Sequence, residues 1–281
     1  MAAGTSSRFV PLSVERPKGL VEVKGEILIE RQIRQLKEAG ITDITLVVGY
    51  KAEMFAYLRD KYAVDIVYNE DFARYNNTSS LIRVIEKLNN TFICSSDNYF
   101  PENVFTRESV DSYYSALYAE GKTNEYCLIT NAKDQITDVK VGGHDSWYMV
   151  GHVFFNHEFS EKFRKLMIKE YCNETTKQGY WEDLYIRYID QLPKMKINRY
   201  QEGDIQEFDS LDELRMFDES YKNDTRSSIV KQICKQLEVE EACVHAFRNI
   251  KHKGNYLQFQ FKVYDDVYEY NAENGIEIKK I

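Results

Sequence analysis

The sequence predicts an α/β fold in which helices flank a mixed, mostly parallel sheet. Strand-like and helix-like segments alternate at short spacing over the first hundred residues. One of them, Asp43 to Tyr50, is almost continuously apolar, as strands buried on both faces of a parallel sheet are. The chain also opens on small and hydroxyl-bearing residues, which can form a turn against phosphate groups.

The first hundred residues predict βαβ units and therefore a Rossmann-like sheet. Glu26 to Ala39 has apolar residues at helical spacing and ends at Gly40, which predicts a helix. The elements expected after it are a strand at Asp43 to Tyr50, a helix at Ala52 to Lys61, a strand at Asp65 to Asn69, a helix at Ser79 to Leu88 and a strand at Thr91 to Ser95.

Beyond residue 100 the pattern changes to short strands separated by turn signals, and helices follow. The expected strands are Ser112 to Tyr118, Tyr126 to Thr130, Ile136 to Val141, Trp147 to Phe155, Met195 to Tyr200 and Ile205 to Phe208. The expected helices are His157 to Cys172, Trp181 to Gln191 and Leu211 to Tyr221. We expect one domain over residues 1–222.

A small α+β extension is expected at the carboxyl end, over residues 229–281. Residues 222–228 are polar and predict a linker. After it we expect a helix at Ile229 to Leu237, a short helix at Glu240 to Phe247, and a hairpin formed by Tyr256 to Tyr264 and Val267 to Tyr270.

Composition excludes several classes of function. The 281 residues carry a net charge of -8, which argues against a general nucleic-acid-binding protein. The five cysteines are odd in number and form no C-x-x-C pair, so we expect neither disulfides nor zinc, and we expect a reducing, cytoplasmic location. No run of about 18 apolar residues predicts a membrane span.

Three groups of polar residues are candidates for chemistry. In the opening stretch, Arg8 and Lys18 can neutralise phosphate groups that the small residues approach. Asp97 follows a buried strand, at the sheet edge where ligands bind, and is either a Mg²⁺ ligand or a turn residue. Asp209 precedes a helix, and its residue type and position alone favour a helix cap.

These stretches resemble a known family. Met1 to Arg8 with Pro17-Lys18 resembles the opening signature of the nucleoside-triphosphate transferases, which have the nucleotide-diphospho-sugar transferase fold. The chain is similar in particular to the bacterial choline-phosphate cytidylyltransferases. This closer resemblance rests on Leu28 to Ile33, Val48 to Tyr50, Tyr75 to Leu81, Ser96 to Tyr99, Thr123 to Tyr126, Glu182 to Tyr185 and Glu207 to Ser210, and spans roughly residues 1–220.

The resemblance implies transfer of CMP from CTP to phosphocholine, with an oxygen of phosphocholine attacking the α-phosphorus in line. It implies that Arg8 and Lys18 are catalytic and that Asp97 and Asp209 hold Mg²⁺, with Asp97 also at the nucleotide. The other nucleotide-binding residues that it implies are Ala2, Ala3, Gly4, Ser6, Ser7, Asn76 and Ser80.

Choline carries a quaternary ammonium group, which cannot donate hydrogen bonds and is recognised by aromatic faces and negative charge. The candidates are Tyr126, Tyr180, Trp181, Glu182 and Asp183. For each aromatic residue, an ordinary place in the core or on the surface is the alternative.

The chain departs from the family pattern at three points. Ser6 stands where the family usually has a glycine, and a serine is tolerated there if its φ is negative. Ser95 stands where relatives often have an additional acidic residue. The family's first strand, an apolar run of about five residues, is expected before Ala2, and without it the neighbouring strands would have open edges. The tail beyond residue 225 lies outside the resemblance and is faintly similar to the opening of bacterial choline kinases.

Two other functions stay open from the sequence. One is a nucleotidyltransferase for another acceptor, either a phosphorylated amine such as 2-aminoethylphosphonate or a sugar 1-phosphate. The other is a non-catalytic nucleotide-binding module, which the expected absence of a central strand would favour. The sequence leaves the oligomeric state open.

Overall fold

The computed structural model describes residues 1–250, 257–273 and 277–281, and its contacts divide the chain into two units. Unit 1 comprises Met1–Gly4 and Ile29–Glu207, and unit 2 comprises Thr5–Leu28 and Phe208–Ile281. Each unit therefore contains residues from both halves of the chain. The expected domain boundary at residue 222 stays a prediction.

Unit 1 contains a parallel strand pair and a four-stranded mixed sheet, as the sequence predicts. In the pair, β3 (Thr45–Val48) and β4 (Asp65–Tyr68) align Thr45 with Asp65. The larger sheet has the order β5 (Thr91–Cys94), β8 (Ile136–Phe155), β7 (Tyr113–Thr130) and β9 (Lys196–Arg199). In this sheet β5 and β7 are each antiparallel to β8, and β9 is parallel to β7.

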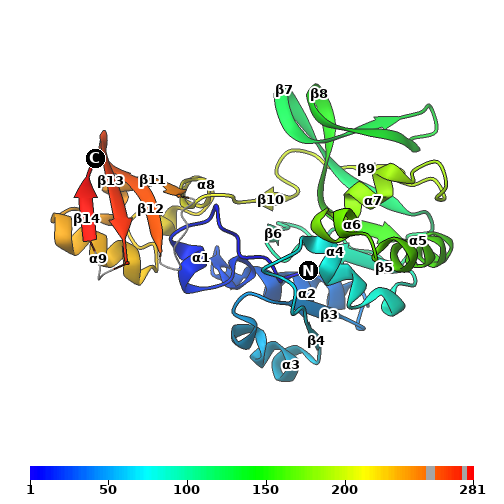
Figure 1. Ribbon diagram of the computed structural model, residues 1–281, viewed down its shortest axis with the longest axis horizontal. Helices are drawn as coiled ribbons and strands as arrows, with labels where there is room; N and C mark the ends of the chain where they lie inside the picture. The colour runs from blue at the N-terminus through cyan, green and yellow to red at the C-terminus, as the bar shows by residue number, and fades with distance from the viewer. Residues whose placement is uncertain (251–256, 274–276) are drawn as a thin grey trace. The chain divides into compact units, whose positions relative to one another are not determined.

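The strands β7 and β8 form one long arm, running side by side over most of their length (Figure 1). The sequence predicts four separate strands here, and this is wrong. Gly121 and Gly142, which are typical of turns, have φ of 73° and 81° and lie inside the strands, beside shifts in their register. They act as bulges, so the strands bend and continue.

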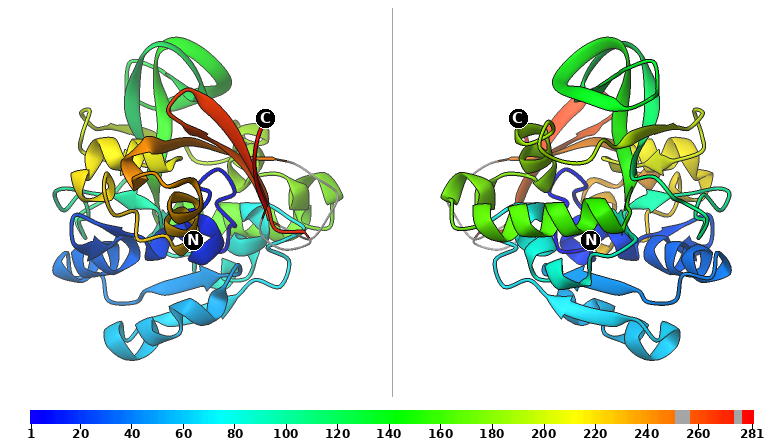
Figure 2. Two further views of the ribbon diagram at one scale, coloured as in Figure 1. Left: turned by 90° about the vertical axis from the view of Figure 1, so that its left-hand side faces the viewer. Right: turned by 90° about the vertical axis from the view of Figure 1, so that its right-hand side faces the viewer.

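Helices such as α5 (His157–Glu170) cover the sheet of unit 1 (Figure 2). Asn156 caps α5 by accepting a hydrogen bond from the Phe159 N–H at 3.0 Å, and the Phe159 and Phe163 rings pack against Phe155 of β8. The other helical elements of this unit are α2 (Leu28–Glu38), η2 (Ala52–Phe55), α3 (Tyr57–Tyr62), α4 (Asn77–Ile82), η3 (Ile85–Lys87), α6 (Glu174–Gln178) and α7 (Trp181–Arg187). The short strands β6 (Asn98–Tyr99) and β10 (Gln206–Glu207) pair with each other.

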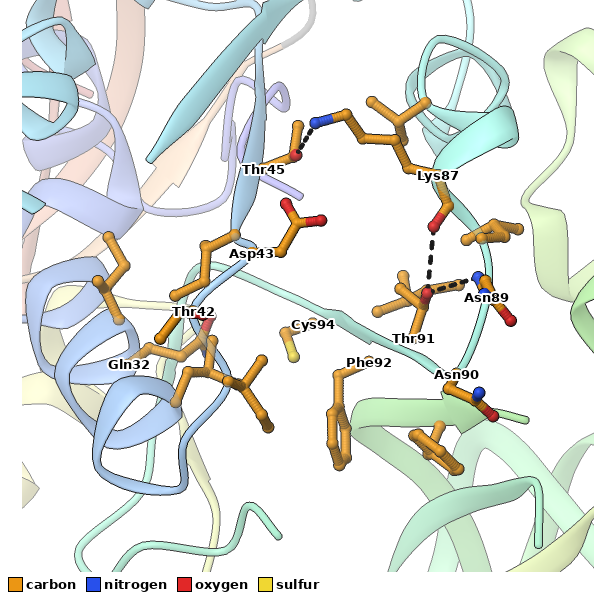
Figure 3. A pocket seen from close by; sticks show the side chains of 18 of the residues that line it. Gln32, Thr42, Asp43, Thr45, Lys87, Asn89, Asn90, Thr91, Phe92 and Cys94 are labelled. Carbon is orange, nitrogen blue, oxygen red and sulfur yellow. Dashed lines mark hydrogen bonds between the residues drawn. The ribbon is translucent and has the colours of Figure 1, made fainter. Parts of the chain in front are cut away.

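A cavity of about 710 Å³ lies between β3 and β5 (Figure 3). At one end of this cavity, Met1 and Ala2 bridge the two strands through backbone hydrogen bonds. The Ala2 N–H donates to the Val47 carbonyl at 2.7 Å, and the Ser96 N–H donates to the Met1 carbonyl at 3.1 Å. The apolar lining includes Ile33, Leu36, Leu46, Leu81, Leu88 and Ile93. The hollow therefore has strands on two sides and helical elements on the others, as the position of a buried strand does.

Unit 2 joins the opening stretch to the carboxyl-terminal sheet. Its first part contains α1 (Leu12–Glu15), η1 (Lys18–Leu20), β1 (Glu22–Val23) and β2 (Glu26–Ile27). Its second part contains α8 (Leu211–Phe217), η4 (Glu219–Tyr221), α9 (Ser228–Leu237) and η5 (Glu241–Cys243). The antiparallel sheet follows, with β11 (Val244–Asn249), β12 (Gln258–Val263), β13 (Asp266–Asn271) and β14 (Glu277–Lys280) in that order.

The expected hairpin is confirmed by β12 and β13, although Tyr256 lies outside the described residues. The helix expected over Glu240 to Phe247 is wrong, because β11 begins at Val244. There Phe247 contacts Phe259 and Phe261 of β12, a packing between strands that a local apolar pattern does not reveal.

The segment expected to be a linker is packed into unit 2. Thr225 and Ser227 are completely buried. Thr225 donates from its N–H and its hydroxyl to the Glu241 carboxylate, and Ser227 Oγ accepts from Val230 N–H at 3.1 Å. The polar side chains of this segment therefore satisfy buried groups and cap α9.

Candidate functional site

The opening loop begins in unit 1, where backbone contacts fix it against the end of β3. Ala2 and Ala3 are buried, and the Ala3 carbonyl accepts a hydrogen bond from Tyr50 N–H at 3.1 Å. A side chain at Gly49 would come within 2.9 Å of the Ala3 carbonyl oxygen and 2.5 Å of Phe72 Cβ. Glycine at position 49 therefore lets the loop lie close to the strand end.

Ser6 has a left-handed backbone, with φ of 48°. The expectation that a serine is accommodated here with negative φ is wrong. The Ser6 carbonyl accepts a hydrogen bond from Phe9 N–H at 2.9 Å, which closes a turn around Ser7 and Arg8. The conformation is one that glycine adopts without a steric penalty, and this accounts for the glycine that the family usually has.

Three of the predicted site residues meet in unit 2. Arg8 Nη1 lies 2.6 Å from Asp209 Oδ2, and Lys18 Nζ lies 3.6 Å from Asp209 Oδ1. The Lys18 side chain is only 5% exposed, whereas that of Arg8 is 76% exposed. The cluster thus combines a fixed, buried positive charge with one that can reach into solvent, and the Asp209 carboxylate contacts both.

Asp209 is not the cap of the helix that follows it. Ser210 caps α8, because its Oγ accepts a hydrogen bond from Glu213 N–H at 3.2 Å. The Glu213 carboxylate in turn accepts from Asp209 N–H at 2.8 Å. The Asp209 side chain is therefore available to the two cations, and the cap expected from residue type lies one position later.

In unit 1, two neighbouring carboxylates at the start of α7 accept hydrogen bonds from α4 and β7. Glu182 accepts from Asn77 Nδ2 at 3.0 Å and from the Tyr114 hydroxyl at 3.1 Å. Asp183 accepts from the Tyr126 hydroxyl at 2.9 Å. Asn77 lies in one of the stretches that carry the resemblance, but nothing in the sequence marks Tyr114, which the register of β7 brings here.

The environment of Glu182 changes its acid–base behaviour. Burial raises the pKa of its carboxyl group to about 7, although hydrogen bonds from Asn77 and Tyr114 oppose this shift. The carboxyl group therefore changes charge near neutral pH. A cation bound beside it would favour the ionised form.

The aromatic candidates differ in exposure. Trp181 is 1% exposed, stacks on Tyr114 with ring centroids 5.9 Å apart and contacts Phe155 and Phe163, all within the main core. Tyr126 is half-buried and Tyr180 is exposed. Contact of Trp181 with a ligand stays a prediction, and its observed packing supports the backbone of Glu182 and Asp183.

The remaining candidates of unit 1 beyond the opening loop lie at α4 and after β5. Asn76 Nδ2 donates to the Gln178 carbonyl at 2.6 Å, and the buried Ser80 hydroxyl accepts from Asn69 Nδ2 at 3.0 Å. Asp97 follows β5, as expected, and is half-buried. Among residues 1–250, 257–273 and 277–281, no three His, Cys, Asp or Glu side chains form a ready metal site.

Comparison with known proteins gives concordant results. Residues 1–131 match the family described as MobA-like NTP transferase domain. The choline-phosphate cytidylyltransferase of Streptococcus pneumoniae is 34% identical over 224 residues, covering 80% of this chain and 97% of that protein. The 2-aminoethylphosphonate cytidylyltransferase of Lancefieldella rimae is 32% identical over 225 residues, covering 79% and 91%.

Solved structures share the fold. The CTP:phosphocholine cytidylyltransferase of Streptococcus pneumoniae has a TM-score of 0.75 at 35% identity, covering 79% of this chain and 96% of that one. The inositol-1-phosphate CTP transferase of T. maritima has a TM-score of 0.59 at 15% identity, covering 84% and 94%. The predicted nucleotide-diphospho-sugar transferase fold is thereby confirmed. No helix in the described part of the chain is long and apolar enough to cross a membrane.

Proposed function

We propose that this chain transfers CMP from CTP to phosphocholine. The chain belongs to the nucleotidyltransferase family of the choline-phosphate cytidylyltransferases. The products are CDP-choline and pyrophosphate. The observation that carries this proposal is the cluster of Arg8, Lys18 and Asp209 in unit 2. Two cations held by one carboxylate beside a small-residue loop are suited to a triphosphate.

In the proposed mechanism an oxygen of phosphocholine attacks the α-phosphorus and pyrophosphate leaves on the opposite side. Negative charge accumulates on the phosphoryl oxygens, and a fixed positive charge stabilises it without rearranging. Lys18 supplies that charge, because it is buried and already held by Asp209. Arg8, which is exposed, binds the outer phosphates, and the hydroxyl groups of Ser6 and Ser7 donate to them.

A divalent metal is part of this proposal. Mg²⁺ binds one or two carboxylates together with phosphate oxygens and water. Asp209 would supply a carboxylate once phosphate groups take over its contact with the exposed Arg8, and Asp97 is the candidate in unit 1. When bound, the metal would neutralise charge on the phosphates.

The acceptor site that we propose is the pair Glu182 and Asp183, with the rings of Tyr126 and Tyr180. Two adjacent carboxylates attract a quaternary ammonium group, and tyrosine faces contact its methyl groups. The hydrogen bonds from Tyr114 and Tyr126 orient the two carboxylates.

Five free cysteines are consistent with the cytoplasmic setting that the proposal includes.

A primary amine is the specific alternative, favoured by the 32% identity to the 2-aminoethylphosphonate cytidylyltransferase. The deciding experiment measures pyrophosphate release with CTP fixed and with phosphocholine, phosphoethanolamine, 2-aminoethylphosphonate or glucose 1-phosphate as acceptor. We expect the highest kcat/KM with phosphocholine. Equal values for the amines would overturn the acceptor assignment. Binding of CTP with Mg²⁺ in calorimetry, without pyrophosphate release from any acceptor, would identify a non-catalytic module.

A further inference from the structure

The catalytic cations lie on a segment that the carboxyl-terminal part of the chain holds in place. Arg8 and Lys18 flank α1 in sequence, and the contacts of Thr5–Leu28 group it with Phe208–Ile281 in unit 2. The resemblance on which the activity rests ends near residue 220. Residues beyond that point contact the segment that carries the two cations.

The strongest link joins α1 to the start of α9. Glu15 Oε1 accepts hydrogen bonds from Ser228 N–H at 2.7 Å, from Ile229 N–H at 3.2 Å and from the Ser228 hydroxyl. The first N–H groups of a helix have no partner within the helix, and its dipole attracts negative charge there. The Glu15 carboxylate therefore accepts hydrogen bonds from the first N–H groups of α9 and places a negative charge at the amino-terminal end of the helix.

The helix that binds Glu15 is firmly anchored. Its N-cap is the buried Ser227, and it buries Val230 and Ile233 completely. A rigid support of this kind restricts the movement of whatever is bound to its end. Glu15 lies seven residues after Arg8 and three before Lys18, so fixing it restricts both cations.

A second set of contacts holds the chain on the other side of Lys18. The Tyr221 hydroxyl donates to the Glu22 carbonyl at 2.7 Å, and Arg226 Nη1 lies 3.3 Å from the Glu22 carboxylate. Lys24 N–H donates to Asp218 Oδ2 at 2.6 Å. The segment that carries the cations is thereby attached to residues 218–229 both before and after Lys18.

We propose that the carboxyl-terminal part of unit 2 positions the nucleotide-binding cations, and that Glu15 is a positioning residue acting through α9. This inference rests on the proposed function, because it assigns the support of the same nucleotide site. A loop of small residues is pliable, and ordering it upon binding costs conformational entropy. Attachment to α9 removes part of that cost before CTP arrives.

The sharpest variant is Ser228→Pro. Proline is well tolerated at the first position of a helix, and Ser227 has φ of -102° and ψ of 123°, which suits a residue before proline. The substitution keeps α9 but removes the N–H and the hydroxyl of Ser228, which are two of the three groups that donate to Glu15. We expect KM for CTP to rise about tenfold, as loss of charge-assisted hydrogen bonds allows, while KM for phosphocholine stays unchanged.

Glu15→Gln tests the other partner of the contact and should raise KM for CTP in the same direction. The double variant should be no worse than the more severe single variant, since both remove one interaction. Glu219→Gln is the matched control, because Glu219 is an exposed carboxylate of the same unit whose ion pair is with Lys222. It should leave both KM values unchanged.

Wild-type KM for CTP in folded Ser228→Pro and Glu15→Gln would overturn the inference, even if their melting temperatures fell. If Ser228→Pro does not fold, Glu15→Gln and Ser228→Ala, which keeps the N–H, decide the question by the same readout. Failure of the proposed function is recognised separately: the wild-type chain itself would not release pyrophosphate. In that case calorimetric CTP affinity replaces KM, and an unchanged affinity in the variants would again overturn the inference.

Discussion

At the scale of single residues, Ser6 has a conformation that its side chain disfavours. A left-handed backbone costs a non-glycine residue about 1–2 kcal/mol, part of which glycine recovers. We expect Ser6→Gly to raise the free energy of unfolding by about 0.5–1 kcal/mol, measured by urea denaturation. Ser7, whose φ is not positive, is the control, and Ser7→Gly should lower stability. Equal effects at both positions would contradict the assignment.

Lys18 is the residue whose charge the proposed chemistry needs most. We expect Lys18→Ala to lower turnover at least ~100-fold, because a preorganised charge near the transferring phosphoryl group is lost. The Asp209 carboxylate would still pair with Arg8, so the variant should fold. Lys231→Ala removes an exposed lysine of the same unit that pairs with Asp224 and should keep full turnover. Near-normal turnover in Lys18→Ala would remove Lys18 from the mechanism.

Glu182 predicts a dependence of stability on pH. Its pKa of about 7 in the folded protein exceeds the unfolded value of about 4.3, so the folded state retains the proton over this range. The contribution of the protonated Glu182 carboxyl group to the free energy of unfolding is complete below about pH 4.3 and is lost as the pH rises through 7. The free energy of unfolding of Glu182→Gln, relative to wild type, should therefore increase between pH 5 and pH 8. Glu158→Gln, at an exposed position on α5, should give a constant difference. A constant difference for Glu182→Gln as well would contradict the shifted pKa.

At the scale of elements, the hollow between β3 and β5 has the form of a strand position. Val47 and Cys94 direct carbonyl groups toward it, since they accept hydrogen bonds from Ala2 and Met1. Backbone direction alternates along a strand, so Thr45 and Phe92 direct theirs the same way. An extended apolar segment there would meet backbone partners on both edges and apolar side chains on both faces.

We therefore expect that adding five strand-forming apolar residues before Met1 raises the free energy of unfolding by about 2 kcal/mol or more. Each buried large apolar side chain contributes about 1.5–3 kcal/mol, against about 1–2 kcal/mol per residue for ordering the backbone. An extension of equal length with a central proline is the control, because proline breaks the ladder. Equal stability of the two extended chains would show that the hollow does not take a strand.

The elements that could be predicted are those whose pattern is local. The strands β3 and β5 and the amphipathic helix α2 have continuous or periodic apolar residues, and the sequence predicts each within a few positions. The arm of β7 and β8 could not be predicted as two strands, because partners across the ladder turn Gly121 and Gly142 from turn residues into bulges.

The candidate site likewise contains residues that the sequence marks and residues that only the fold brings together. The family resemblance predicts Arg8, Lys18 and Asp209 as site residues, and the structure brings them together in unit 2. Tyr114 carries no local signal, since it meets Glu182 only through the register of β7 and the position of α7. The side chain that caps α8 could not be chosen between Asp209 and Ser210 from residue type, because both can accept the hydrogen bond.

At the scale of the whole molecule, the cation cluster and the proposed acceptor site belong to different units. Arg8, Lys18 and Asp209 belong to unit 2, whereas Glu182 and Asp183 belong to unit 1. Ligand binding stabilises the region that it contacts and the elements attached to it. The two substrates should therefore protect different parts of the chain from amide hydrogen exchange.

We expect CTP with Mg²⁺ to slow exchange at residues 5–28 and, through Glu15, at the first turn of α9. Phosphocholine alone should slow exchange at residues 180–185. In Ser228→Pro the protection of residues 5–28 by saturating CTP should remain, while that of α9 is weakened, because only the Ile229 N–H still donates to Glu15. Undiminished protection of α9 in this variant would mean that the helix responds to CTP by a route other than Glu15.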